Sequence, residues 1–106
     1  MKFENRGFST NEDLVLPINY NQSHWSIRKQ AREQYCMEQM WKCYHCGGDL
    51  HFNPPEEIMD KPINLKLFPK SMFDYPIHLH HNHKTGMTIG AVHAKCNAIL
   101  WQYYGE

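Results

Sequence analysis

The 106-residue sequence has no apolar run of membrane-spanning length, no net charge and only four cysteines. The first absence excludes a transmembrane helix, which needs about 20 consecutive apolar residues. The amino-terminal segment also lacks the apolar core of a secretory signal peptide, so we expect a cytoplasmic protein with reduced thiols and no membrane association. Zero net charge argues against a protein that binds nucleic acid strongly through electrostatic attraction alone.

The composition, 42% hydrophobic and 13% aromatic, is that of a folded domain and excludes a disordered or collagen-like chain. A domain of this length has a small core and gains from a metal or covalent cross-link. We expect one domain over residues 23–106, preceded by an extended N-terminal arm, residues 1–22, which docks Leu and Ile side chains.

Three cysteines and one histidine form two short pairs with the spacing of metal ligands. Two residues separate Cys43 from Cys46, and two residues separate His93 from Cys96. Two such pairs, far apart in the chain, are typical of tetrahedral zinc sites, whereas a disulfide framework belongs to secreted proteins. We therefore predict a structural zinc held by these four residues, with Cys36 as a small buried side chain on a helix.

The local patterns predict helices at both ends of the domain and a hairpin near its end. The first helix begins at a serine cap, Ser23 or Ser26, and ends near residue 40. Its apolar face consists of Ile27, Ala31, Tyr35, Met37 and Trp41. Residues 50–52 are predicted as a short strand, and residues 53–76 as a surface insertion anchored by these side chains: Ile63, Leu65, Leu67 and Phe68. A strand over 77–82, a turn over 83–86, a strand over 87–90 and a helix over 91–103 follow.

Four histidines fall within six positions on the first hairpin strand and at the start of its turn: His78, His80, His81 and His83. Imidazole takes up protons near neutral pH and binds transition metals, so this run is a candidate for acid–base chemistry. In a regular strand, His78 and His80 share one face and His81 and His83 the other. We interpret His78 as structural, and leave His83 open between a turn residue and a contact to substrate or ion.

The arrangement resembles the HNH, or ββα-metal, endonucleases, and among them the phage recombination endonuclease VII-like group. The likeness covers residues 25–103 without the insertion. It rests on Cys43-x2-Cys46, on the run Leu79–Gly86 and on Cys96-Asn97. It implies a small α+β domain with a ββα-metal (HNH) hairpin-helix core, a structural zinc knuckle and an N-terminal supporting helix.

The resemblance also implies roles for individual residues. His81 matches the general base, and His80 and Asn97 match ligands of a catalytic divalent ion (Mn²⁺, Ni²⁺, Co²⁺ or Mg²⁺), with His83 as a possible addition. His80 stands where a carboxylate is more usual, and His93 where the family has a cysteine. The implied substrate is DNA, and the implied source is a phage acting in its host's cytoplasm.

Five basic side chains are candidates for DNA contacts: Arg28, Lys29, Arg32, Lys84 and Lys95. The first three can equally form a solvated helix face. A non-catalytic zinc-binding module that binds nucleic acid or protein is the main alternative function. Eight histidines suggest a third, an acid-sensing or metal-buffering protein. Monomer and homodimer both remain open.

Overall fold

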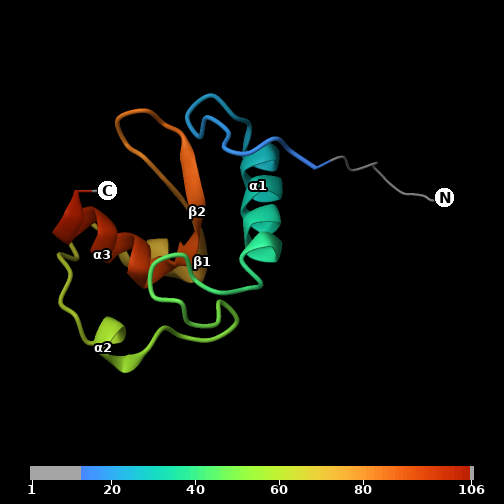
Figure 1. Ribbon diagram of the computed structural model, residues 1–106. Helices are drawn as coiled ribbons and strands as arrows, with labels where there is room; N and C mark the ends of the chain where they lie inside the picture. Colours follow the sequence, from blue (N-terminus) through green and yellow to red (C-terminus); the bar gives the residue numbers. More distant parts are fainter. Residues whose placement is uncertain (1–12, 106) are drawn as a thin grey trace.

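The computed structural model describes residues 13–105 and confirms a small α+β fold (Figure 1). Its elements in chain order are α1 (Trp25–Glu38), α2 (Glu56–Met59), the 3-10 helix η2 (Lys70–Asp74), β1 (Ile77–His81), β2 (Thr88–His93) and α3 (Ala94–Tyr104). The antiparallel β1–β2 hairpin lies between α1 and α3. No helix within the described residues has the length and apolar character needed to cross a membrane.

Helix α1 packs on the hairpin through a narrower face than its sequence predicts. Ala31, Tyr35 and Cys36 are buried, which confirms the prediction for Cys36. Met37 is 70% exposed, so its place on the apolar face was wrong. The Tyr35 hydroxyl lies 2.9 Å from Thr88 Oγ1 and ties the helix to β2.

Both ends of α1 differ from the prediction. The N-cap is His24, whose Nδ1 accepts a hydrogen bond from the Ser26 amide, so the two predicted caps, Ser23 and Ser26, are both wrong. The helix stops at Glu38, because Met40 and Trp41 adopt left-handed φ values of 54° and 60°. This left-handed pair turns the chain away from the helix axis toward the first cysteine pair, and places Trp41 outside the helix.

The described part of the arm docks as predicted; residues 1–12 of the predicted arm lie outside the described range. Leu14, Leu16 and Ile18 pack against the core. The Thr88 amide donates to the Ile18 carbonyl and the Ile18 amide donates to Thr88 Oγ1, both at 3.0 Å. The described part of the arm therefore lies along β2 and packs on the same core as the domain.

The hairpin is longer on its second strand than predicted. Strand β2 runs to His93, so α3 begins at Ala94, three residues later than expected. The register pairs His80 with Gly90 but His81 with Thr88, so Ile89 forms a bulge. Gly105, with a φ of 72°, ends α3 as predicted.

The connection between the first cysteine pair and β1 is only partly as predicted. No strand forms at residues 50–52, because Asp49 Oδ1 accepts the His51 amide at 2.8 Å and turns the chain. Phe68 is buried and anchors the insertion, but Leu65 and Leu67 are 58% and 56% exposed. Two of the four predicted anchors are therefore wrong.

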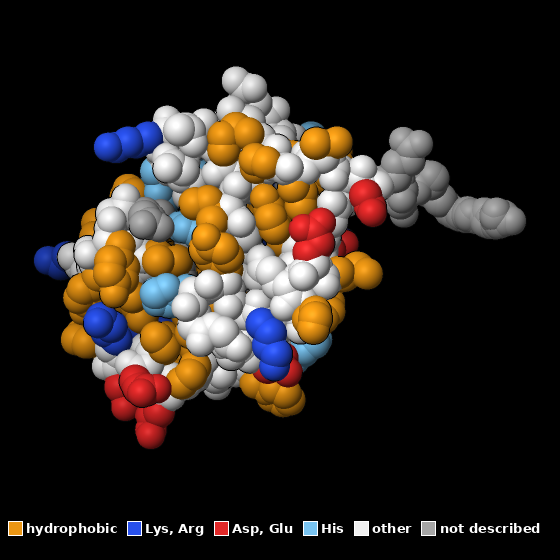
Figure 2. All heavy atoms as spheres, in the orientation of Figure 1, with side chains coloured by type: hydrophobic (Ala, Val, Ile, Leu, Met, Phe, Trp, Pro, Cys, Tyr) orange, Lys and Arg blue, Asp and Glu red, His pale blue; other side chains and the backbone are white. Residues whose placement is uncertain are grey.

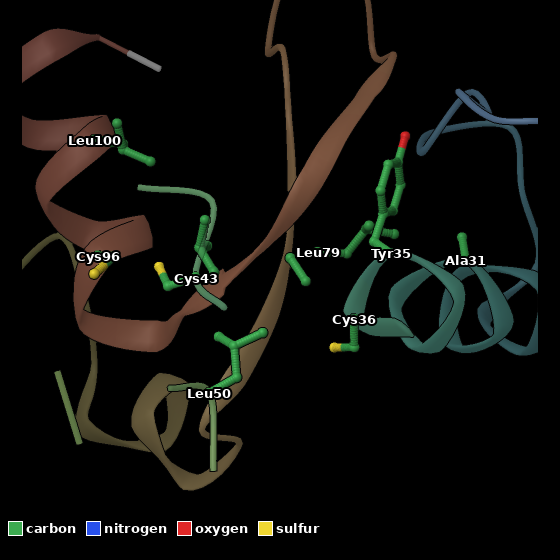
Figure 3. Close-up of a cluster of buried hydrophobic side chains, with 10 residues drawn as sticks. Ala31, Tyr35, Cys36, Cys43, Leu50, Leu79, Cys96 and Leu100 are labelled. Atoms are coloured by element: carbon green, nitrogen blue, oxygen red, sulfur yellow. The ribbon is translucent and has the colours of Figure 1, made fainter. Parts of the chain in front are cut away.

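The hydrophobic core includes two of the predicted zinc ligands, Cys43 and Cys96. Figure 3 shows Tyr35 and Cys36 on the α1 side of the hairpin, and Cys43, Leu50 and Cys96 on the α3 side. Cys43 and Cys96 are 3% and 0% exposed. The pairs Cys43–Cys46 and His93–Cys96 thus come together within the core, at its α3 end.

Candidate functional site

Cys43, Cys46, His93 and Cys96 are positioned to hold a metal ion. Their ligand atoms all lie within 4.8 Å of one another, and all but the half-buried Cys46 are buried. His93 Nδ1 lies 3.4 Å from Cys46 Sγ and 3.7 Å from Cys96 Sγ. Tetrahedral zinc with ordinary bond lengths has S···N edges of about 3.6 Å, so the donor set and its spacing fit zinc.

Cys43 and Cys46 lie in a tight turn whose backbone amides point toward their sulfur atoms. The Cys43 amide donates to the Gly48 carbonyl at 2.8 Å, and Gly47, with a φ of 75°, allows the reversal. The amides of His45 and Gly48 lie 3.4 Å from Cys43 Sγ and Cys46 Sγ respectively. These hydrogen bonds favour the thiolate form that a metal ion requires.

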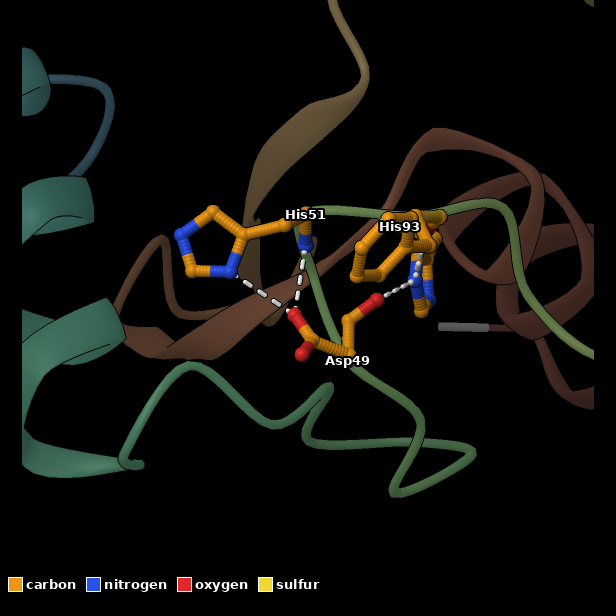
Figure 4. A network of polar contacts seen from close by, with 4 residues as sticks. Asp49, His51 and His93 are labelled. Carbon is orange, nitrogen blue, oxygen red and sulfur yellow. Dashed lines mark hydrogen bonds and ion pairs between the residues drawn. The ribbon is translucent and has the colours of Figure 1, made fainter.

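The proton on His93 is placed by the loop that follows the first cysteine pair (Figure 4). His93 Nε2 lies 3.0 Å from the carbonyl oxygens of both Asp49 and Phe52. Carbonyls only accept hydrogen bonds, so Nε2 carries the proton and Nδ1 presents its lone pair to the sulfurs. The Asp49 carboxylate holds His51 through the ring Nδ1 at 2.8 Å, which fixes this loop.

The three thiols affect one another's ionisation. The Cys96 thiol donates a hydrogen bond to Cys43 and lowers the pKa of Cys43 to about 4. The same hydrogen bond raises the pKa of Cys96, and burial raises the pKa of Cys46. Neighbouring thiolates repel one another, and a divalent cation between them would relieve that repulsion. The electrostatics therefore match a cation site.

A row of four aromatic rings, which we call the ring row, crosses the turn end of the hairpin: Tyr20, His81, His83 and Trp101. Tyr20 stacks on His81, with centroids 3.9 Å apart and planes 7° from parallel. His83 contacts His81 at 4.6 Å and Trp101 at 4.1 Å. Burial, and then the nearby charge of His83, lowers the pKa of His81, which favours the neutral ring that can accept a proton.

Asn97, a predicted ion ligand, lies next to the ring row. It lines a cavity of about 180 Å³ together with His83 and Trp101. Asn97 Nδ2 lies 3.1 Å from His78 Nδ1, and His78 Nε2 donates to the Met72 carbonyl at 2.9 Å. His78 Nδ1 is therefore the acceptor. The amide nitrogen of Asn97 points to His78, and its carbonyl oxygen points elsewhere.

His80, the other predicted ion ligand, is 1% exposed. It pairs with Gly90 just before the register shift and is absent from the residues that line the cavity of His83 and Asn97. The structure thus places His83 between the other two, in ring contact with His81 and in one cavity with Asn97. The roles of His80, His81 and Asn97 stay predictions.

Sequence reasoning missed Tyr20, Trp101 and the orienting role of His78. The hydrogen bond between His78 and Asn97 joins a strand to a helix. The spacing of the two residues in the sequence does not predict such a contact. Tyr20 lies in an arm without periodicity.

The five candidate DNA contacts come from three elements: α1 carries Arg28, Lys29 and Arg32, the hairpin turn carries Lys84, and α3 carries Lys95. The Arg28 guanidinium carbon lies 4.0 Å from the centre of the Tyr20 ring, and Lys95 Nζ donates to the Met59 carbonyl at 2.8 Å. Lys29 and Lys84 are exposed and Arg32 is half-buried. On the face shown in Figure 2, Lys and Arg side chains are scattered, with acidic groups nearby.

Comparison with known proteins identifies no relative. No protein-family model matches the chain, and neither a curated protein nor a solved structure shows significant similarity to it.

Proposed function

We propose that this protein is a metal-dependent endonuclease that hydrolyses DNA phosphodiester bonds at an HNH-type site, with a separate structural zinc. One observation carries the proposal. His81 and His83 are in ring contact, and His83 shares a cavity with Asn97, the residue directly after the last ligand of the metal group. The order β1, β2, α3 agrees with a ββα-metal core, and the likeness to phage enzymes suggests a phage origin.

The chemistry assigned to each residue follows from its surroundings. Hydrolysis near neutral pH needs a proton acceptor for the attacking water, and the neutral, half-buried His81 fills this role. The Asn97 carbonyl, with His80 or His83, would hold a divalent ion. Such an ion, when bound, supplies positive charge to the phosphate oxygens as negative charge develops.

The Cys3His group has a different task in this proposal. Its four ligands are all protein side chains, and three of them are buried, which leaves no coordination position for a water or a phosphate. Zinc in such a closed group stabilises the fold and takes no part in catalysis. Two ions with separate duties therefore suit the two clusters.

The test compares His81→Ala with a matched control, His45→Ala. His45 lies between Cys43 and Cys46, outside both the ring row and the metal-ligand group. With supercoiled plasmid and Mn²⁺, we expect His81→Ala to lower the cleavage rate by about 100-fold or more, with unchanged zinc content and melting temperature. The control variant should cleave like wild type.

Equal cleavage by wild type and His81→Ala would contradict the proposal. A folded, zinc-loaded wild type that fails to cleave DNA with any of the divalent ions would point instead to the non-catalytic zinc-binding module. The zinc content and the cleavage rate together separate the two functions.

A further inference from the structure

The arm carries an aromatic side chain onto the histidine that we propose as the base. Tyr20 belongs to the segment before α1, whose backbone is fixed at the turn end of the hairpin: the Tyr20 amide donates to the Gly86 carbonyl at 2.7 Å. A β-bridge between Asn19 and Met87 continues this attachment. The backbone of Tyr20 is therefore held by the same turn that follows His81.

The Tyr20 ring is covered on both faces. His81 stacks on one face at 3.9 Å, nearly parallel. The guanidinium of Arg28 lies 4.0 Å from the ring centre. Two groups cannot occupy the same face at these distances, so Arg28 covers the opposite one. Arg28 Nε also donates to the Tyr20 carbonyl at 2.8 Å, which secures the Arg28–Tyr20–His81 stack from α1.

We propose that Tyr20, held by Arg28, is a positioning residue that keeps the His81 imidazole in the orientation needed to accept a proton. Tyr20 closes one face of the ring, and His83 meets the ring at 4.6 Å with the two planes 63° apart, so rotation of the imidazole is restricted from two sides. A misplacement of about 1 Å can cost about 100-fold in rate. This inference rests on the proposed function.

The stack also gives Arg28 a different role from the one expected from sequence. A cation above a tyrosine ring, with its Nε bonded to a carbonyl, is already engaged inside the domain. In this role Arg28 affects the cleavage rate by holding Tyr20 against His81, and it does not contribute to DNA binding through a phosphate contact. This difference can be measured, because positioning changes kcat and phosphate contact changes KM.

The experiment compares Tyr20→Leu, Tyr20→Phe and a control, Tyr75→Leu, at a tyrosine that is 73% exposed. Stacking needs the ring and not the hydroxyl, so Tyr20→Phe should keep kcat within about twofold of wild type. We expect Tyr20→Leu to lower kcat by about 10- to 100-fold with KM nearly unchanged. The control should behave like wild type in plasmid cleavage.

A spectroscopic readout reports the stack directly. A parallel aromatic ring shields the protons of its neighbour, so the His81 ring signals, assigned by their loss in His81→Ala, should move downfield in Tyr20→Leu. They should stay in place in Tyr20→Phe. Arg28→Gln leaves the Tyr20 ring present and should give a smaller fall in kcat, so the inference can be tested even if Tyr20→Leu folds poorly.

Three results would overturn the inference. The first is unchanged kcat and unchanged His81 signals in Tyr20→Leu. The second is an equal loss in Tyr20→Phe and Tyr20→Leu. The third is a raised KM with normal kcat in Arg28→Gln, which would make Arg28 a DNA contact. A wild type that does not cleave DNA would refute both the proposed function and the positioning role of Tyr20. If wild type is active but Tyr20→Leu keeps its kcat and its His81 signals, only the positioning role is refuted.

Discussion

The metal-ligand group and the ring row both use residues of the hairpin and α3 but are built in opposite ways. The former draws its ligands from two local pairs, Cys43–Cys46 and His93–Cys96. The latter takes one ring each from the arm, from β1, from the turn and from α3. The ligands of a local pair are only three positions apart, whereas the Tyr20 ring reaches its place through contacts between segments that are distant in sequence. Spacing therefore predicts the first kind of site far better than the second.

Exposure separates the two regions as strongly as their construction does. Most of the metal-ligand group is buried, but His83 is exposed and Trp101 is 39% exposed. A closed group can stabilise a fold, and an open one can meet a large substrate. The following predictions test this division, from the largest expected effect to the smallest.

Removal of one ligand should abolish the fold. We expect Cys96→Ser to lose its metal and its near-ultraviolet circular dichroism, since structural zinc contributes roughly 10 kcal/mol or more to folding. Cys36→Ala is the control, because Cys36 is also buried but lies outside the metal-ligand group. The control should keep one metal ion and lose only about 1 kcal/mol. A folded, metal-free Cys96→Ser would break the comparison.

His80→Asp distinguishes an ion ligand from a core histidine. Neutral imidazole and amide ligands favour Mn²⁺, Co²⁺ or Ni²⁺ over Mg²⁺, so wild type should cleave at lower concentrations of those ions. If His80 binds the ion, the aspartate should shift the preference toward Mg²⁺. If His80 is a core residue, a carboxylate at a position that is 1% exposed should instead lower the melting temperature with no shift in preference. Cleavage titrations and thermal unfolding decide between them.

Loss of the hydrogen bond between His78 and Asn97 should weaken the binding of the proposed catalytic ion. His78→Phe leaves the Asn97 amide free to rotate, and we expect the Mn²⁺ concentration for half-maximal cleavage to rise about 10-fold. His78→Gln, which keeps an acceptor, is the matched variant and should lose less. The zinc content of both should match wild type. An unchanged Mn²⁺ dependence in His78→Phe would show that Asn97 needs no such support.

The salt dependence of DNA binding should be shallow. Arg28 and Lys95 are engaged within the domain, which leaves Lys29, Arg32 and Lys84 for phosphates. Three contacts give a slope of log affinity against log salt of about −2.7, and Lys84→Ala should reduce its size by about 0.9. Lys66→Ala, at an exposed lysine of the insertion, is the control. A slope near −7 would reveal a basic surface that the scattered charges do not supply.

The sequence predicted most of the fold because its signals were local. The metal ligands, the hairpin, Gly105 and the buried Cys36 all follow from spacing or from one residue's backbone preference. The start of α3 was misplaced because Ala91 and Val92 suit either a helix or a strand, and pairing with β1 decides for the strand. The ring row depends on contacts between distant segments, which periodicity does not encode.

The metal-ligand group also has a topological consequence for the segment between its two halves. An ion bound by all four ligands would close residues 47–92 into a loop, with the exposed Leu65 and Leu67 within it. A protease that cuts at these leucines would open the loop without releasing either fragment, because each fragment keeps two ligands. The nicked protein would migrate as one species in a native gel and separate into two pieces only when a chelator removes the ion.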